Sequence, residues 1–330
     1  MTPPPTPGIH HVTCVTNDPQ GNLDFWIETL GLRLVKRSIN QDDPETYHFF
    51  FADAEGTPGT SMTFFPWEDL SDGTIGAGQV ARTAFRVPEG SLDYWEGRFE
   101  ARGVPCDDRT ERFGETVLPF EDPGGLPLEL IEVEIPDDDP TVPWTEFVPE
   151  RAAIRGFHSV TLWLDDPNPT GDLLRTMGFE GRGTEPAAEG DPGGERTRFA
   201  AAGPVGSYVD VLPASRAGRR GSGTVHHVAF QTPTDADQDA MREAVRSRGL
   251  RPTEPIDRHW FRSVYFREFG GVLFELATNG PGYDSDEPLE SLGERLVLPG
   301  EFETRRDRIE EALPEVTVPR AEAADAGTDE

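Results

Sequence analysis

The sequence predicts an α+β fold in which four copies of a βαβββ unit form two cupped, barrel-like mixed sheets. The first observation is a repeat: strand-like segments return at residues 9–15, 80–87, 157–164 and 225–231, with a period of roughly 70 residues. The second is that an amphipathic helix pattern and further strand-like stretches follow each of these segments. One such unit cannot close a sheet by itself, so we expect the units to share sheets in pairs.

The elements within each unit follow the same order. A helix is predicted where apolar residues recur every three or four positions and glycine ends the pattern. These helices are expected at residues 21–31, 91–103, 173–179 and 235–249. Each unit then ends in a short apolar run with strand character, at residues 61–65, 128–131, 208–212 and 272–277.

We place module 1 at residues 8–67, module 2 at 76–134, module 3 at 155–213 and module 4 at 224–280. A linker rich in proline and acidic residues, 135–154, separates the two halves. A C-terminal extension with an acidic disordered tail covers residues 281–330. Residues 1–7 and 320–330 are expected to lack a fixed structure, and residues 185–195 to form a solvated loop.

The composition indicates a folded protein with a strongly acidic surface. The 330 residues include 61 acidic and 30 basic ones, which gives a formal charge of −31, and Lys36 is the single lysine. So much charge is typical of disorder, but six tryptophans and twenty phenylalanines indicate a packed core. We interpret the chain as a halophilic protein of a salt-rich cytoplasm, where screening suppresses self-repulsion.

The same features exclude several classes of partner. An acidic surface without a basic stripe argues against nucleic-acid binding. No apolar run approaches the ~20 residues that span a bilayer, and no secretory signal is visible, so we expect a cytoplasmic protein without a membrane partner. Cys14 and Cys106 do not make a disulfide framework. A homo-oligomer is compatible with the sequence, which leaves the oligomeric state open.

The strongest functional signal is a repeated histidine pair. His10 and His11 open the first strand-like segment (GIHHVTCVT), and His226 and His227 open the last one (TVHHVAFQT). Glu275 lies in a later apolar run, where an unpaired charge would be costly. A lone buried histidine is more often a hydrogen-bonded core residue than a ligand. The recurrence at equivalent positions favours a 2-His-1-carboxylate iron(II) site instead.

Alignment of the four units separates them by chemistry. The first-strand position holds His11, Arg82, Ser159 and His227, and the last-strand position holds Thr63, Glu129, Asp210 and Glu275. Modules 1 and 4 therefore supply three metal ligands, His11, His227 and Glu275, beside a threonine that we interpret as a packed strand residue. In modules 2 and 3, Arg82 is expected to pair with Glu129 and Asp210 in place of a metal. We expect one metal per chain, with module 1 paired with module 4 and module 2 with module 3.

The βαβββ repeat and its HHVT and HHVAF openings resemble the vicinal-oxygen-chelate superfamily of glyoxalases, bleomycin-resistance proteins and extradiol dioxygenases. Residues 8–53, 256–267 and 298–306 resemble more closely its branch of ring-cleaving hydroquinone dioxygenases. The resemblance implies that His10, Thr13, His226, Arg258 and Tyr265 surround the metal ligands. His226 would act as an acid or base, while Tyr265 and Arg258 would orient a substrate oxygen.

Two further expectations concern this site. Regular strand alternation would turn His10 and His226 away from the side taken by His11 and His227. Trp260, Phe261 and Phe50 are candidates for the wall of a ring-binding pocket. His48 carries no recognisable signal.

The function expected from the sequence is a non-haem Fe(II)-dependent, extradiol-type ring-cleaving dioxygenase. Its partners would be dioxygen and a small hydroquinone or catechol-like substrate, and Mn(II) is an alternative metal because it accepts the same ligands. A glyoxalase-like isomerase or lyase is the alternative enzyme, but it would need a second carboxylate where Thr63 lies. A metal-free binding module would have a bare aromatic cleft, against which the three ligands argue.

Overall fold

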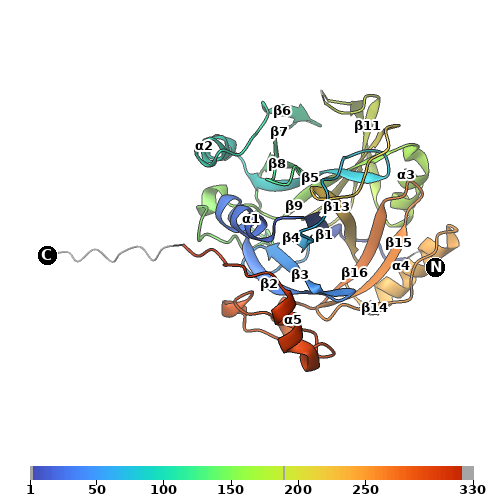
Figure 1. Ribbon diagram of the computed structural model, residues 1–330. Coiled ribbons are helices and arrows are strands. Elements are labelled where there is room, and N and C mark those ends of the chain that lie inside the picture. Colours follow the sequence, from blue (N-terminus) through green and yellow to red (C-terminus); the bar gives the residue numbers. More distant parts are fainter. Residues whose placement is uncertain (1–2, 189, 322–330) are drawn as a thin grey trace.

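The structure is a computed structural model that describes residues 3–188 and 190–321. It contains two curled eight-stranded mixed sheets, which confirms the predicted α+β fold (Figure 1). The first sheet has the strand order β14-β15-β16-β13-β1-β4-β3-β2, and the second has the order β10-β11-β12-β9-β5-β8-β7-β6. The strands of the first and last units thus share one sheet, and those of the two middle units share the other.

The strands recur in the predicted order. The first sheet contains β1 (Ile9–Thr16), β2 (Arg33–Asn40), β3 (Asp43–Ala52), β4 (Ser61–Pro66), β13 (Thr224–Gln231), β14 (Ile256–Asp257), β15 (Phe261–Arg267) and β16 (Leu273–Pro281). The second contains β5 (Gln79–Pro88), β6 (Thr110–Arg112), β7 (Glu115–Glu121), β8 (Pro127–Val133), β9 (Phe157–Leu164), β10 (Glu180–Pro186), β11 (Glu195–Ala200) and β12 (Tyr208–Pro213).

One helix follows the first strand of each unit. These are α1 (Pro19–Asp24) with the π-helical turn η1 (Phe25–Thr29), then α2 (Leu92–Arg102), α3 (Pro167–Thr176) and α4 (Asp235–Ser247). The expected start of the third helix at residue 173 was wrong. This helix begins at Pro167, because the Asp166 side chain caps the Asn168 amide and proline suits the first turn. Among the described residues, no helix is long and apolar enough to cross a membrane.

The two sheets pack against each other through aromatic side chains. Trp26, in the turn after α1, is fully buried. Its ring lies 6.0 Å from that of Phe51 and 5.1 Å from that of Phe64 in the first sheet, and 5.9 Å from that of Phe85 in the second. Each fully buried aromatic side chain contributes about 2–3 kcal/mol of hydrophobic stabilisation. The helix pattern of the first unit is therefore apolar because it fills the space between the sheets.

Both ends of the described chain are ordered. The expectation of a structureless N-terminus was wrong for residues 3–7, because Thr6 is buried, its amide donates to the Met177 carbonyl and its hydroxyl donates to the Gln231 carbonyl. The C-terminal extension carries η3 (Tyr283–Ser285), η4 (Leu289–Ser291), η5 (Glu303–Arg305) and α5 (Arg306–Ala312), which lies beside β3 (Figure 1). The tail expected beyond residue 321 lies outside the described residues.

Two acidic segments are less exposed than expected. Within the linker, which also carries the short helix η2 (Glu150–Ala152), Asp139 forms a 2.8 Å ion pair with Arg86, and both side chains are buried. In the 185–195 segment, expected to be solvated, Asp191 has a buried carboxylate that pairs with Arg196 at 2.6 Å. Composition alone did not reveal these contacts because their arginine partners come from strands of the second sheet.

Candidate metal centre

Three adjacent strands of the first sheet bring the predicted ligands together. His11 in β1, His227 in β13 and Glu275 in β16 are all buried. The Nε2 atoms of the two histidines are 3.3 Å apart, and Glu275 Oε2 lies 3.3 Å from His11 Nε2 and 2.8 Å from His227 Nε2. Ligands at right angles around a six-coordinate ion, about 2.1 Å from it, are separated by about 3 Å. The triad therefore has the spacing of one face of such a coordination sphere.

The chemistry of these donor atoms also fits a divalent cation. Glu275 Oε1 accepts a 2.5 Å hydrogen bond from the Ser263 hydroxyl, whereas Oε2 faces the Nε2 atoms of His11 and His227. Burial opposes ionisation of Glu275, but the adjacent His11 and His227 outweigh it and hold the pKa of the carboxyl well below its usual range. Burial lowers the pKa of His227, so its imidazole is neutral at pH 7. An anionic oxygen thus faces ring nitrogens that can ligate.

A second pair of histidines orients the first. His10 Nδ1 lies 2.9 Å from His11 Nδ1, and His226 Nδ1 lies 2.8 Å from His227 Nδ1. We call His10 and His226 the outer histidines. Burial lowers the pKa values of both to about 3, so their rings are neutral. A ligand histidine that uses Nε2 for the ion carries its proton on Nδ1 and donates it to the outer ring. Such hydrogen bonds set the tautomer and ring orientation of metal ligands.

Strand alternation had predicted that the outer histidines point away from the ligands, and this was wrong. The pairing of β1 with β13 shifts register between Ile9 and His11 and again between Thr13 and Cys14. The first shift leaves His10 as an extra residue in β1, and the second leaves His226 as an extra residue in β13. A β-bulge of this kind re-aims a side chain, and bulges occur often beside active sites.

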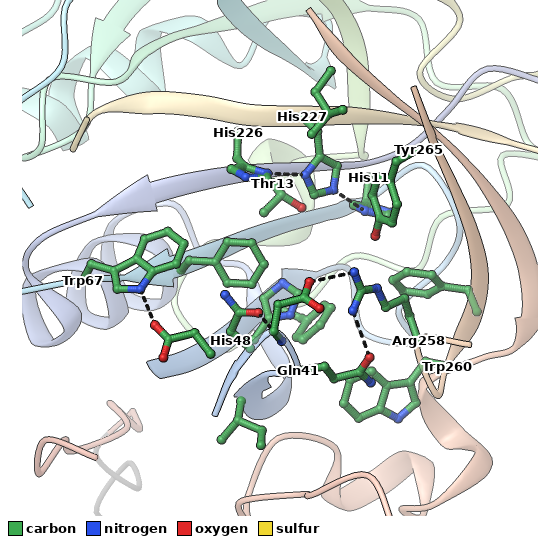
Figure 2. A pocket seen from close by; sticks show the side chains of 18 residues that line it. His11, Thr13, Gln41, His48, Trp67, His226, His227, Arg258, Trp260 and Tyr265 are labelled. Carbon is green, nitrogen blue, oxygen red and sulfur yellow. Dashed lines mark hydrogen bonds and ion pairs between the residues drawn. The ribbon is translucent and has the colours of Figure 1, made fainter. Parts of the chain in front are cut away.

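His11 and His227 border a cavity of about 430 Å³ (Figure 2). Its walls include the expected Phe50, Trp260 and Phe261, and also Phe65 and Trp67, which the sequence did not suggest. His226 lines the cavity, whereas His10 packs against Phe261 with ring centroids 5.2 Å apart. Aromatic walls with a few convergent polar groups are typical of sites for small organic ligands.

The other predicted side chains lie around the same cavity. Thr13 and Thr63 share a 2.8 Å hydrogen bond between their hydroxyls. Arg258 donates to Asp42 at 2.8 Å, and its guanidinium lies 5.4 Å from the centre of the Tyr265 ring. Burial raises the pKa of Tyr265, so the phenol keeps its proton at neutral pH. Thr13, Arg258 and Tyr265 all line the cavity.

Sequence comparison shows the family of the chain. Residues 8–130 and 133–276 match the family described as the Glyoxalase/Bleomycin resistance protein/Dioxygenase superfamily. This chain belongs to that superfamily. Its curated relatives include the protein named "Putative ring-cleaving dioxygenase MhqO" of Bacillus subtilis, which is 43% identical over 313 residues, 93% of this chain and 96% of the relative. They also include the chlorohydroquinone/hydroquinone 1,2-dioxygenase of Sphingobium indicum, 33% identical over 315 residues, 92% of this chain and 94% of the relative.

Two solved structures have the same architecture. The crystal structure titled "putative dioxygenase from Bacillus subtilis" is 42% identical, with a TM-score of 0.90, and the match covers 96% of this chain and 99% of that one. Glyoxalase I of Zea mays is 12% identical, with a TM-score of 0.62, and the match covers 87% of this chain and 97% of that one. This second likeness concerns the fold alone.

In the second sheet of the present chain, arginines occupy the place that corresponds to the metal centre of the first sheet. Arg112 in β6 binds both oxygens of Glu129, at 2.6 and 2.7 Å. Arg198 in β11 binds both oxygens of Asp210, at 2.9 and 3.0 Å, and Arg196 lies 3.3 Å from one of them. Such two-point contacts are strong and hold both partners in place.

The expectation that Arg82 pairs with Glu129 and Asp210 was therefore correct for Glu129 and wrong for Asp210, which Arg198 and Arg196 contact instead. Arg82 lies 3.7 Å from Glu129 and 3.5 Å from Asp191, at distances longer than those of the other arginines. The sequence alignment compared only the first and last strand of each unit. The arginines that form the close contacts lie in β6 and β11, which fall between the first and last strands of their units along the chain. Only the folded sheet shows that their side chains extend to Glu129 and Asp210.

Proposed function

We propose that this protein is a metal-dependent ring-cleaving dioxygenase, in which His11, His227 and Glu275 bind iron(II). The substrates would be dioxygen and a hydroquinone or catechol-like aromatic. The observation that carries the proposal is the convergence of two imidazoles and one carboxylate, within 4.8 Å of one another, beside a cavity with aromatic walls. Two relatives match this chain over nearly their whole length, and they are named a ring-cleaving dioxygenase and a chlorohydroquinone/hydroquinone 1,2-dioxygenase. Their names support the same class of reaction.

The donor set suits iron(II), and Mn(II) is the alternative metal. Two neutral imidazoles and one carboxylate carry a net charge of −1 and occupy one face of the ion, which leaves positions for substrate and dioxygen. Bound iron(II) supplies the electron-transfer chemistry that lets dioxygen react with a closed-shell phenol. Ser263, His10 and His226 hold the three ligands in place, so the site is preorganised before the metal binds.

The remaining side chains bind and orient the substrate. Phe50 and Phe261 contact the ring and exclude water from it. The Arg258 guanidinium is positively charged and Tyr265 is a protonated phenol, so both can donate hydrogen bonds to a substrate oxygen that gains negative charge. His226 lines the cavity next to a ligand and can hold or release a proton at its ring nitrogen.

A glyoxalase-type isomerase is less well supported. Thr63 occupies the position where such an enzyme would place a second carboxylate, and its hydroxyl is engaged by Thr13 at 2.8 Å and by His48 at 3.0 Å. A threonine in these contacts cannot serve as the base that an isomerase needs.

The test is oxygen consumption by the reconstituted enzyme. The protein is loaded anaerobically with Fe(II) or Mn(II) in high-salt buffer and mixed with aerated hydroquinone or catechol in an oxygen-electrode cell. We expect one O2 per substrate and a ring-opened acid detectable by mass spectrometry. His11→Ala should lose both metal and oxygen uptake. The absence of uptake across a panel of phenols, together with isomerase activity on a glutathione adduct, would overturn the proposal.

A further inference from the structure

His48 has no role in the function proposed above, although it lies in the same cavity. It belongs to β3, and Figure 2 shows it across the open space from His11 and His227. Its ring lies against two aromatic rings, with centroids 3.8 Å from that of Phe50 and 4.3 Å from that of Phe65. The imidazole is thus held in a fixed orientation.

Only one of the two ring nitrogens of His48 is engaged by protein. Nε2 lies 3.0 Å from the Thr63 hydroxyl, which in turn contacts the Thr13 hydroxyl at 2.8 Å. Nδ1 has no hydrogen-bond partner within residues 3–188 and 190–321, and the ring borders the cavity. Nδ1 is therefore the atom that a bound molecule can reach.

The repeat shows what this position does in other units. In β15, Ser263 lies two residues before the partner of Glu275 and donates to its carboxylate at 2.5 Å. In β11, Arg196 lies two residues before the partner of Asp210 and contacts its carboxylate at 3.3 Å. In modules 3 and 4 this position thus supports the residue at the end of the unit, whereas in module 2 it is the apolar Val117 and Glu129 is held by Arg112.

His48 occupies the equivalent position in β3, two residues before Phe50, which pairs with Thr63. It supports Thr63 with Nε2 alone. A serine would be enough for one contact with a hydroxyl, so support of Thr63 does not account for a second ring nitrogen that faces the cavity.

The imidazole of His48 is neutral. Burial lowers its pKa well below the usual value, and the nearby His11, His227 and Arg258 lower it further. When the Nε2 proton is donated to Thr63, Nδ1 keeps its lone pair and accepts a hydrogen bond.

The other polar groups of this wall already have partners. Asp42 accepts from Arg258 at 2.8 Å, and Asp43 accepts from the Trp67 indole at 2.8 Å and from Thr46 at 2.8 Å. These contacts fix Oδ2 of each aspartate, whereas Nδ1 of His48 is a neutral acceptor on the cavity wall with no donor among the described residues.

We propose that His48 is a substrate-binding residue whose Nδ1 accepts a hydrogen bond from the ring hydroxyl farthest from His11, His227 and Glu275. The proposal rests on the proposed function and names the substrate class, a 1,4-diol. Hydroxyls in para relation point in opposite directions, so one can approach the triad while the other reaches His48. A catechol presents both hydroxyls on one side and leaves Nδ1 unpaired, which disfavours its binding.

The test compares hydroquinone with its monomethyl ether, 4-methoxyphenol, which keeps one hydroxyl and cannot donate to Nδ1. Anaerobic calorimetric titration of metal-loaded protein gives Kd for both compounds and for catechol. We expect the wild type to bind hydroquinone about 10- to 100-fold more tightly than the ether. His48→Phe, which fills the same space, should lose this preference and leave the Kd of the ether unchanged. His48→Gln, which keeps an acceptor, should restore part of it.

Metal content and melting temperature are measured for each variant, with Phe65→Leu as a control that alters the same wall without removing an acceptor. A His48→Phe protein with normal metal content that loses affinity for both compounds equally would overturn the proposal. So would a wild type that does not discriminate between them. If the wild type binds neither diol but retains the metal, the proposed function fails and the role of His48 fails with it. Binding of hydroquinone without oxygen uptake would contradict the proposed function alone.

Discussion

His226 Nδ1 lies 2.8 Å from His227 Nδ1, which joins a residue of the cavity wall to a ligand of the candidate metal centre. The same contact joins His10 to His11 at 2.9 Å, but His10 packs against Phe261 and does not itself line the cavity. Two histidine pairs of similar geometry therefore differ in what they can reach. Both outer rings can orient a ligand, while only His226 can also meet a substrate.

Substitution of the outer histidines should separate these two roles. We expect His10→Gln and His226→Gln each to weaken metal binding by about 10- to 100-fold, since a flexible amide orients a ligand ring less firmly than the rigid imidazole acceptor does. At saturating metal, His226→Gln should still have a reduced kcat, whereas His10→Gln should recover most of its activity. Chelator competition and steady-state kinetics provide the two measurements. Equal kcat values for the two saturated variants would contradict the distinction.

The hydroxyl of Ser263 should matter for the metal although it does not reach the ion. Ser263→Ala removes the donor to Glu275 Oε1 and frees the carboxylate to rotate, so we expect metal affinity to fall by about tenfold or more. The matched control is Ser159→Ala, because Ser159 contacts His158 at 3.1 Å in the other sheet. Unchanged affinity in Ser263→Ala would show that the carboxylate is held by other contacts.

The arginine cluster of the second sheet should contribute to stability and not to metal binding. Arg112→Met leaves the Glu129 carboxylate buried without its two-point partner, which should destabilise the fold by about 3–5 kcal/mol. The double variant Arg112→Met/Glu129→Leu should regain most of that loss, because no buried charge remains unpaired. Urea unfolding in high salt measures both. Iron content should stay at one per chain, and a second iron in the wild type would refute this division of the sheets.

Acid should weaken the same cluster. Burial alone would raise the pKa values of Glu129 and Glu115, but Arg112 beside Glu129, and His158 with Arg198 beside Glu115, lower both to about 2. A carboxyl whose pKa is lower in the folded than in the unfolded state stabilises the fold at a pH above its unfolded value. This stability should disappear as the pH falls from about 5 towards 2. Urea midpoints across this range, compared with those of Arg112→Met/Glu129→Leu, should show a shallower slope for the double variant.

Salt should support the fold as a whole. With a formal charge of −31, self-repulsion increases when the screening length rises from about 3 Å at 1 M salt to about 10 Å at 0.1 M. We expect the melting temperature and oxygen uptake to fall on dialysis into dilute buffer, and to recover when salt is added back. Identical melting curves at both salt concentrations would remove the halophilic interpretation.

The sequence alone determined the repeated βαβββ order and the two cupped sheets, and it singled out His11, His227 and Glu275 as candidate ligands, which the fold brings together. These features depend on local periodicity and on residues that recur at equivalent positions, and both are visible along the chain. It also indicated an aromatic wall through Phe50 and Trp260, since apolar strand residues beside a site tend to line it.

Only the tertiary structure decided the features that depend on how distant strands meet. The bulges at His10 and His226 follow from the cross-strand register of β1 and β13, which single-strand periodicity does not contain. Arg112 in β6 contacts Glu129 more closely than Arg82 does, at 2.6 Å against 3.7 Å, although β6 lies two strands from β8 and the strand of Arg82 is its direct neighbour. His48 becomes significant once β3 is aligned beside β4. Register and side-chain reach are properties of paired strands, so they arise only when the sheets have formed.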